Sequence, residues 1–102
     1  MQIQTFITKM EKMEIRKIEI IENEINEKVY RHMLVHFDNE DGDRLIFKEK
    51  DMSRESTYKR GVIGTLYLRI IDEPIIKTST KNTDYQYVSD RISITIDRFE
   101  AE

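Results

Sequence analysis

Alternation of apolar and polar residues in two late segments is the feature that most constrains the fold of this chain. Residues 64–70 (GTLYLRI) and residues 91–99 (RISITIDRF) both carry apolar side chains at every second position. A period of two places these side chains on one face of a β-strand. We therefore predict strands over 62–72 and 91–99, whose core-facing side chains are Leu66, Leu68, Ile70, Ile92, Ile94 and Ile96.

A β-hairpin is predicted upstream, over about residues 28–50. Two runs rich in β-branched and aromatic residues, 29–37 and 44–48, flank an acidic segment that contains Asp41-Gly42. Asp and Gly tolerate the positive φ angles of hairpin turns. The predicted strands are 28–37 and 44–50. Alternation assigns Val29, Met33, Val35 and Phe37 to the core face, and Lys28, Tyr30, His32, Leu34 and His36 to the opposite face.

Two structures fit the first third of the chain. Apolar residues between positions 10 and 29 cover about half of a helical wheel, and Thr8 to Glu11 resembles a capping box, so a helix over about 9–28 packed on a β-meander is one alternative, in the α+β class. A strand over about 13–22 is the other, because Ile18 and Ile20 alternate with charged residues. We favour the strand, since it completes a five-stranded barrel without exposed edges.

The 102 residues are enough for a single domain, with a short link at 51–60 and a long loop at about 73–90. Within this loop we favour a short extra strand over 75–78, which contains Ile75 and Ile76, over a segment that contacts phosphate. Two of the three glycines lie in Tyr58–Leu66 (YKRGVIGTL). This segment resembles the K-x-G-x-x-G-T-L start of the fourth strand in small OB (oligonucleotide/oligosaccharide-binding) proteins. The order of the predicted elements agrees with that of OB proteins over most of the chain, and the motif itself spans about nine residues. It implies a mainly β, small five-stranded OB-like barrel, in which Gly61 turns the chain and Gly64 permits a bulge or a close backbone crossing.

The OB resemblance also implies a function. OB proteins that bind single strands place aromatic rings against bases and basic side chains near phosphates. We therefore expect a non-enzymatic protein that binds single-stranded nucleic acid, as a replication or recombination accessory factor. The candidate residues are Tyr30, His32, Lys48, Tyr67, Arg69, Lys77, Lys81, Tyr85 and Tyr87. Ordinary roles fit some of them equally well: Tyr67 and Arg69 as cross-strand partners, and Tyr85 and Tyr87 as residues that fold the loop onto the barrel.

The distribution of charge supports a second hypothesis. The net charge of −3 divides into −4 over residues 1–43, +4 over 44–81 and −3 over 82–102. The basic middle third suits a nucleic acid, whereas the acidic flanks suit a basic protein partner. The alternative function is thus a protein-binding module or inhibitor of the kind that viruses and mobile elements encode. A homo-oligomer that buries additional apolar surface is a third expectation.

Several classes of function are disfavoured by the sequence. The chain has no cysteine, no Gly-x-Ser-x-Gly, no phosphate-binding glycine-rich loop and no HExxH. His32 and His36 lack a third metal ligand, and the acidic segment 38–43 has the wrong spacing for an EF-hand. Neither a signal-peptide h-region nor a membrane-spanning apolar run is present. We expect a cytoplasmic protein without enzymatic activity, cofactor, metal site or membrane association.

Overall fold

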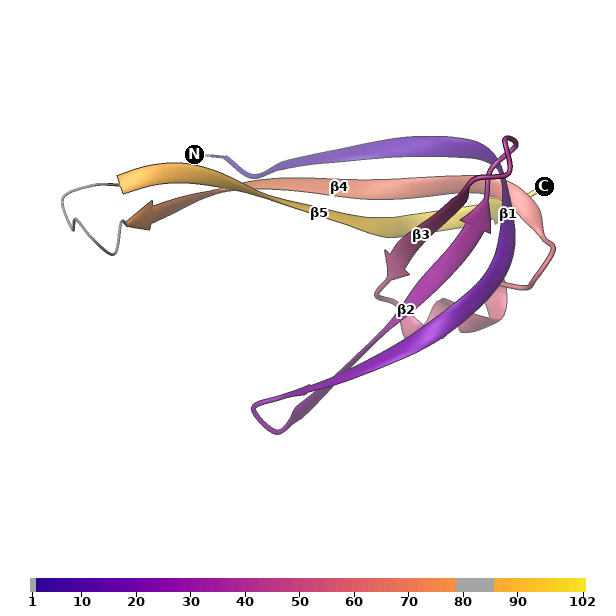
Figure 1. Ribbon diagram of the computed structural model, residues 1–102, viewed down its shortest axis with the longest axis horizontal. Helices are drawn as coiled ribbons and strands as arrows, with labels where there is room; N and C mark the ends of the chain where they lie inside the picture. Colours follow the sequence, from indigo (N-terminus) through magenta and orange to yellow (C-terminus); the bar gives the residue numbers. More distant parts are fainter. Residues whose placement is uncertain (1, 79–85) are drawn as a thin grey trace.

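The fold is a small β-barrel with two projecting arms (Figure 1). The computed structural model describes residues 2–78 and 86–102, except for the side chains of 76–78 and 86–90. Within these residues the sheet closes in the order β1-β2-β3-β5-β4. The predicted mainly β, five-stranded barrel is confirmed. Its elements are β1 (Gln4–Ile25), β2 (Lys28–Asp38), β3 (Arg44–Glu49), the 3₁₀ helix η1 (Met52–Thr57), β4 (Ile63–Thr78) and β5 (Gln86–Ala101).

Strand β1 belongs to both halves of the barrel. Residues 4–14 pair with β4, and residues 14–25 pair with β2, in both cases antiparallel. The register shifts between Met10 and Met13 and again between Ile15 and Lys17, and Lys12 has a φ of 56°. Such bulges bend a strand sharply. The helical alternative for 9–28 is therefore wrong, because this segment obtains its backbone hydrogen bonds from two neighbouring strands.

The two glycines at the start of β4 have separate roles. Gly61 has a φ of 88°, and its N–H donates to the carbonyl of Ile15 at 2.8 Å. The Ile15 N–H in turn donates to the carbonyl of Val62 at 2.9 Å, so the turn is bonded to the bend of β1. A Cβ on Gly64 would overlap the Glu100 carbonyl and lie 2.8 Å from the Cα of Ala101. The expected turn and close backbone approach are both confirmed.

The core fills the barrel where the strands cross. Its buried apolar side chains come from four strands and from the residue that follows η1: Met13, Ile15, Met33, Val35, Phe37, Tyr58, Leu66, Leu68, Ile96 and Phe99. The predicted core face of β2 is thus confirmed at three of its four positions. The link at 51–60 contains η1, which Asp51 caps by accepting from the Ser53 N–H at 3.0 Å. Met52, the first residue of this helix, packs against the core, and Tyr58, which follows the helix, belongs to the core.

Beyond the barrel, the strands continue as two arms (Figure 1). The long arm consists of the far ends of β4 and β5 with the first residues of β1, and the short arm consists of the end of β1 and the start of β2. The β4–β5 ladder continues through Pro74↔Asp90 to Thr78↔Gln86, which confirms the strand favoured over 75–78 and makes the loop prediction wrong for 73–74 and 86–90. The rest of the predicted loop, 79–85, lies outside the described residues. The pairing of β1 with β4 ends at Asp72, so Pro74 lies where one edge of β4 is unpaired, and proline is tolerated there. Strand β1 is likewise longer than the predicted 13–22.

The arms also correct the predicted core. Val29, Ile92 and Ile94 are 61%, 63% and 45% exposed, although their neighbours on the same face, Met33 and Ile96, are buried. Alternation identified the correct face of each strand. These three residues lie past the barrel, however, where the opposite wall has ended and nothing within the described chain covers them.

We predict that Gly64→Ala destabilises the protein by about 3 kcal/mol, the upper range for overpacking, since the added methyl meets β5 backbone atoms that cannot move independently. Thr65→Ala, one residue along on the half-exposed face, should change the free energy of unfolding by less than about 1 kcal/mol. Urea unfolding of both variants measures the difference. A Gly64→Ala protein as stable as the wild type would contradict the close approach of β4 and β5.

Candidate functional site

The outer face of β2 and β3 holds a cavity of about 330 Å³ lined by aromatic and basic side chains. Tyr30 and His32 occupy alternate positions of β2, on the face opposite buried Met33. Lys48 reaches the same face from β3, where it pairs with Leu34. Three of the sequence-predicted residues are therefore brought together. The complete lining is Tyr30, Arg31, His32, Lys48 and Lys50.

Sequence reasoning missed two residues of this cavity. Lys50 follows Lys48 by two positions, and strand periodicity alone would have placed both on one face. Arg31 has the opposite parity in β2, so strand periodicity does not group it with Tyr30 and His32. Its Nε forms an ion pair with Oε1 of Glu22 at 2.5 Å, so its charge is largely compensated. Lys50 is the clearer addition to the site.

Positive charge dominates the cavity. Among the described residues, no ion pair within 4.0 Å involves Lys48 or Lys50. Partial burial, and secondarily the charge of Lys48, lower the pKa of His32 below its usual value of 6.5. His32 is therefore neutral at pH 7, and the Tyr30 ring, in a residue that is 51% exposed, stands beside the lysines. The arrangement can accept an anion together with a flat apolar group.

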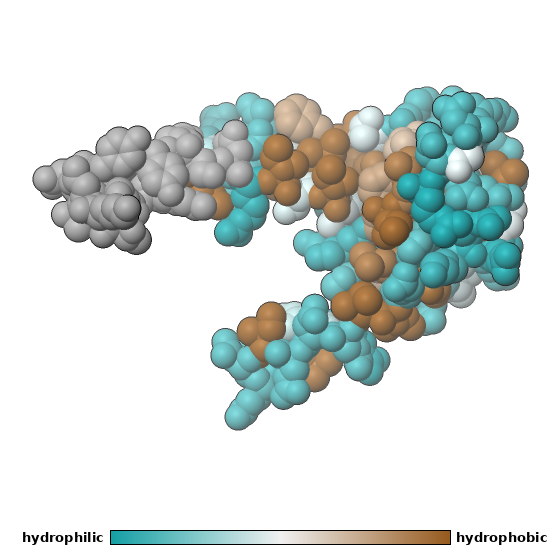
Figure 2. All heavy atoms as spheres, viewed as in Figure 1, coloured by the Kyte–Doolittle hydropathy of each residue, from teal (hydrophilic) through white to brown (hydrophobic). Residues whose placement is uncertain are grey.

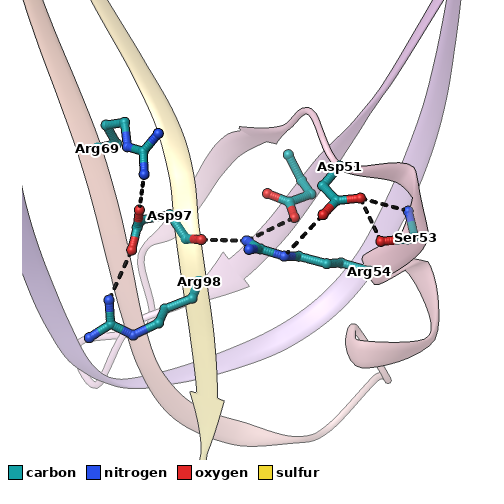
Figure 3. Close-up of polar contacts among 7 residues, drawn as sticks. Asp51, Ser53, Arg54, Arg69, Asp97 and Arg98 are labelled. Carbon is teal, nitrogen blue, oxygen red and sulfur yellow. Dashed lines mark hydrogen bonds and ion pairs between the residues drawn. The ribbon is translucent and has the colours of Figure 1, made fainter.

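Tyr67 and Arg69 lie elsewhere, on the outer face of β4, where both contact β5. Figure 3 shows Arg69 with its partners Asp97 and Arg98. The guanidinium carbon of Arg98 is 3.8 Å from the centroid of the Tyr67 ring, so it covers one face of that ring. The Asp97 carboxylate accepts from Arg69 Nη2 at 2.6 Å and from Arg98 Nη1 at 2.9 Å. Burial raises the pKa of Asp97, but these hydrogen bonds outweigh it and leave the pKa lowered. The two residues have the geometry of cross-strand surface partners.

The remaining predicted residues are on or near the long arm. Lys77 and Tyr87 face each other in the β4–β5 ladder, but their side chains lie outside what the structure describes. Lys81 and Tyr85 lie outside the described residues altogether. The expectation that these four contact nucleic acid stays a prediction.

A second cavity, of about 190 Å³, lies at the end of the barrel where β3 meets β5. These strands are joined by the single parallel pairing Lys48↔Thr95. Beside it, Arg54 from η1 places Nη1 3.3 Å from Oε1 of Glu49 and donates to the Asp97 carbonyl (Figure 3). One side chain thus connects η1, β3 and β5.

Glu49 is the buried acid of this cluster, since the residue is only 1% exposed. Burial raises its pKa, and the nearby Arg54 opposes that rise. Removing the arginine would leave the carboxylate without its counter-charge in a dry environment. The cluster therefore closes the barrel, and its charged groups are engaged with one another.

We predict that Arg54→Met lowers the free energy of unfolding at pH 7 by about 3 kcal/mol. This value is the low end of the range measured when one partner of a buried ion pair is removed, and we choose it because Arg54 is only half-buried. A group whose pKa is raised in the folded state loses stability as pH rises through that pKa, so the defect should shrink when the pH is lowered to about 5. Arg44→Met, which removes an exposed ion pair with Asp38, should cost less than about 1 kcal/mol. Chemical denaturation at both pH values tests this; equal losses for the two variants would contradict it.

Two further observations concern metal binding and membrane-spanning helices. Within the described residues, no three His, Cys, Asp or Glu side chains group closely enough to hold a metal ion. None of the helical structure described has the length and apolar character needed to cross a membrane.

No family model matches the chain, and searches of curated protein sequences and of solved structures likewise found no match.

Proposed function

We propose that the protein is a non-enzymatic, OB-like protein that binds single-stranded nucleic acid, as an accessory factor in replication or recombination. The observation that carries this proposal is the convergence of Tyr30, His32, Lys48 and Lys50 on one cavity of the outer β2–β3 face. This is the sheet face that OB folds use for oligonucleotides. The strand order and the roles of Gly61 and Gly64 support the resemblance on which the proposal rests.

The chemistry of the cavity favours a single strand over a duplex. An exposed tyrosine ring can stack on an unpaired base of any sequence, whereas the bases of a duplex already stack on one another. Lys48 and Lys50 line the same cavity as Tyr30, and in this proposal they contact the phosphates next to the stacked base. A cavity of about 330 Å³ beside a ring is suited to a small number of nucleotides rather than to the groove of a helix.

Local charge matters more here than the net charge of −3. The lysines of the cavity belong to the middle third of the chain, which has a net charge of +4. The nearby carboxylate of Asp51, which caps η1, is engaged by Arg54 and Ser53. Binding should therefore be weak, local and strongly reduced by salt.

We predict that Tyr30→Ala weakens binding of a labelled single-stranded oligonucleotide by about 30-fold, which corresponds to about 2 kcal/mol, the middle of the range for losing one stacked base. Lys50→Ala should weaken it and reduce the salt dependence by about 0.7, the slope for one phosphate contact on a single strand. Lys59→Ala removes an equally exposed lysine in the turn before β4 and serves as the control. Fluorescence anisotropy at several salt concentrations measures all three.

Binding by the Tyr67→Ala variant and by the wild type shows which face of the barrel forms the interface. Tyr67→Ala should bind nearly as the wild type does, because Arg98 already covers that ring. If Tyr67→Ala weakens binding more than Tyr30→Ala does, the interface lies on β4 and β5 instead. If the wild type binds neither single strands nor duplex at low salt, the proposed function is wrong.

We also predict that affinity rises several-fold as the pH is lowered from 7.5 to 5.5. The pKa of His32 is lowered in the unbound protein by burial and by Lys48. A phosphate nearby would raise it again, so binding takes up a proton and is favoured at lower pH. His32→Gln should remove most of this rise. A histidine whose pKa is lowered in the folded state makes the unbound protein less stable as the pH falls below 6.5. Circular dichroism at each pH therefore checks that the protein is still folded. If affinity rises equally at low pH in His32→Gln, the proposed role of His32 is wrong.

A further inference from the structure

The basic cavity lies beside an open edge of β2 as well as on the outer face of that strand. Tyr30, Arg31 and His32 all line it, although consecutive residues of a strand point to opposite faces. A cavity lined by three consecutive residues reaches the strand from the side. The β2–β3 ladder agrees with this position, since it ends at Met33↔Glu49 whereas β2 begins well before that pairing.

The backbone groups of Val29 and Arg31 point out of this edge. The β1–β2 turn at 26–27 has two residues with φ of 51° and 65°, as a type I′ hairpin requires. The flanking pair, Ile25 and Lys28, therefore exchanges both backbone hydrogen bonds, and bonded and non-bonded pairs alternate from there along the ladder. This alternation directs the N–H and C=O of Val29 and Arg31 away from β1.

The other end of β2 gives the same assignment independently. The Asn39 N–H donates to the Asp43 carbonyl at 3.0 Å, so the alternation counted back from this bond directs the odd-numbered residues of β2 toward β3. Val29 and Arg31 belong to this set but lie past the end of β3. Among the described residues, only β1 pairs with this part of β2, so the outward N–H and C=O of these two residues are available to a ligand.

The cavity is next to the place that β3 would fill if it were longer. The β2–β3 register would put Asp51 opposite Arg31, but the chain leaves the sheet after β3 and Asp51 caps η1 instead. A ligand beside Arg31 meets the Tyr30 ring and the ammonium groups of Lys48 and Lys50 in the same cavity. It therefore finds an aromatic ring, two cations and one backbone donor–acceptor pair together.

We infer that the backbone N–H and C=O of Arg31 hydrogen-bond the Watson–Crick edge of an unpaired base held in the cavity. This inference rests on the proposed function and adds that the site recognises the base itself, besides stacking on it and contacting phosphates. All four natural bases carry donors and acceptors side by side on this edge, and the edge is accessible only in a single strand. The site thus requires an unpaired, unmodified base but does not select one sequence.

A base suits this edge better than an added peptide strand does. The edge ends at the turn 26–27, so it presents the outward groups of only Val29 and Arg31, whereas an average strand has about 5–6 residues. An added strand also relies on pockets for its alternate side chains. Figure 2 shows mostly hydrophilic side chains over the short arm, to which this edge belongs. Two lysines beside the edge attract phosphate, which a nucleotide supplies.

Proline substitution tests the role of the Arg31 backbone. Arg31→Pro removes the N–H but no hydrogen bond to β1, and proline is tolerated where the N–H of an edge strand faces outward. Arg31→Ala keeps the N–H and is the reference for losing the side chain. Val29→Pro is the matched control, because its N–H leaves the same edge but Val29 does not line the cavity. Circular dichroism checks that each variant is folded.

Fluorescence anisotropy measures binding to two labelled thymidine oligonucleotides of equal length, one unmodified and one methylated at N3 of every thymine. We expect Arg31→Pro to bind the unmodified strand about 5-fold more weakly than Arg31→Ala does, as for one lost hydrogen bond. Val29→Pro should bind it as the wild type does. Methylation should weaken wild-type binding by about 10-fold, because it removes the donor for the Arg31 carbonyl and leaves that acceptor unsatisfied.

The outcomes separate this inference from the proposed function. If the wild type binds both strands equally, or if Arg31→Pro binds as Arg31→Ala does, the Arg31 backbone does not contact the base, although the proposed function stands. Equal losses in the two proline variants also overturn the inference, since Val29 lies outside the cavity. If Arg31→Pro proves unfolded, the methylated strand decides alone. A wild type that does not bind the unmodified strand overturns the proposed function, and the inference with it.

Discussion

The fold depends on the bend of one strand. Because β1 pairs with β4 through its first half and with β2 through its second, the five strands can close into a ring only if β1 turns sharply between them. Two register shifts and the positive φ of Lys12 supply that turn, and the turn at Gly61 fixes it through the hydrogen bonds between Ile15, Gly61 and Val62. The glycine is needed because the backbone there has a φ of 88°, which costs residues with a Cβ roughly 1–2 kcal/mol.

Closure on the opposite side of the barrel is much weaker and relies on side chains. Strands β3 and β5 share one pairing, Lys48↔Thr95, whereas β4 and β5 pair along their whole described lengths. Arg54 compensates by linking the buried Glu49 carboxylate to the Asp97 carbonyl, and Asp97 in turn holds Arg69 and Arg98. This chain of contacts runs from η1 across β5 to β4, so the ion pairs that Arg69 and Arg98 form with Asp97 belong to the network that completes the barrel.

The two-residue period of the sequence predicted which face of each strand is apolar, but it did not predict how far the strands and the buried core extend. Leu66, Leu68 and Ile96 are buried as expected, while Ile92 and Ile94 have the same parity and are exposed. A period of two reports which side of a strand is apolar, but not whether another strand passes over it. The same limit applies to the site. Parity placed Tyr30 and His32 on one face, but it could not show that Tyr67 is covered by Arg98, because that contact depends on the register shift next to Tyr67 in the β4–β5 ladder.

The basic cavity and the exposed apolar residues of the long arm use opposite faces of the strands. The cavity lies on the outer face of β2 and β3, whereas Phe6, Ile92 and Ile94 lie on the inner face of β1, β4 and β5. Because a β-strand presents alternate residues to opposite faces, the sequence can place an apolar surface and a basic surface on one sheet without mixing them. A nucleic acid bound in the cavity therefore leaves the apolar face of the long arm uncovered.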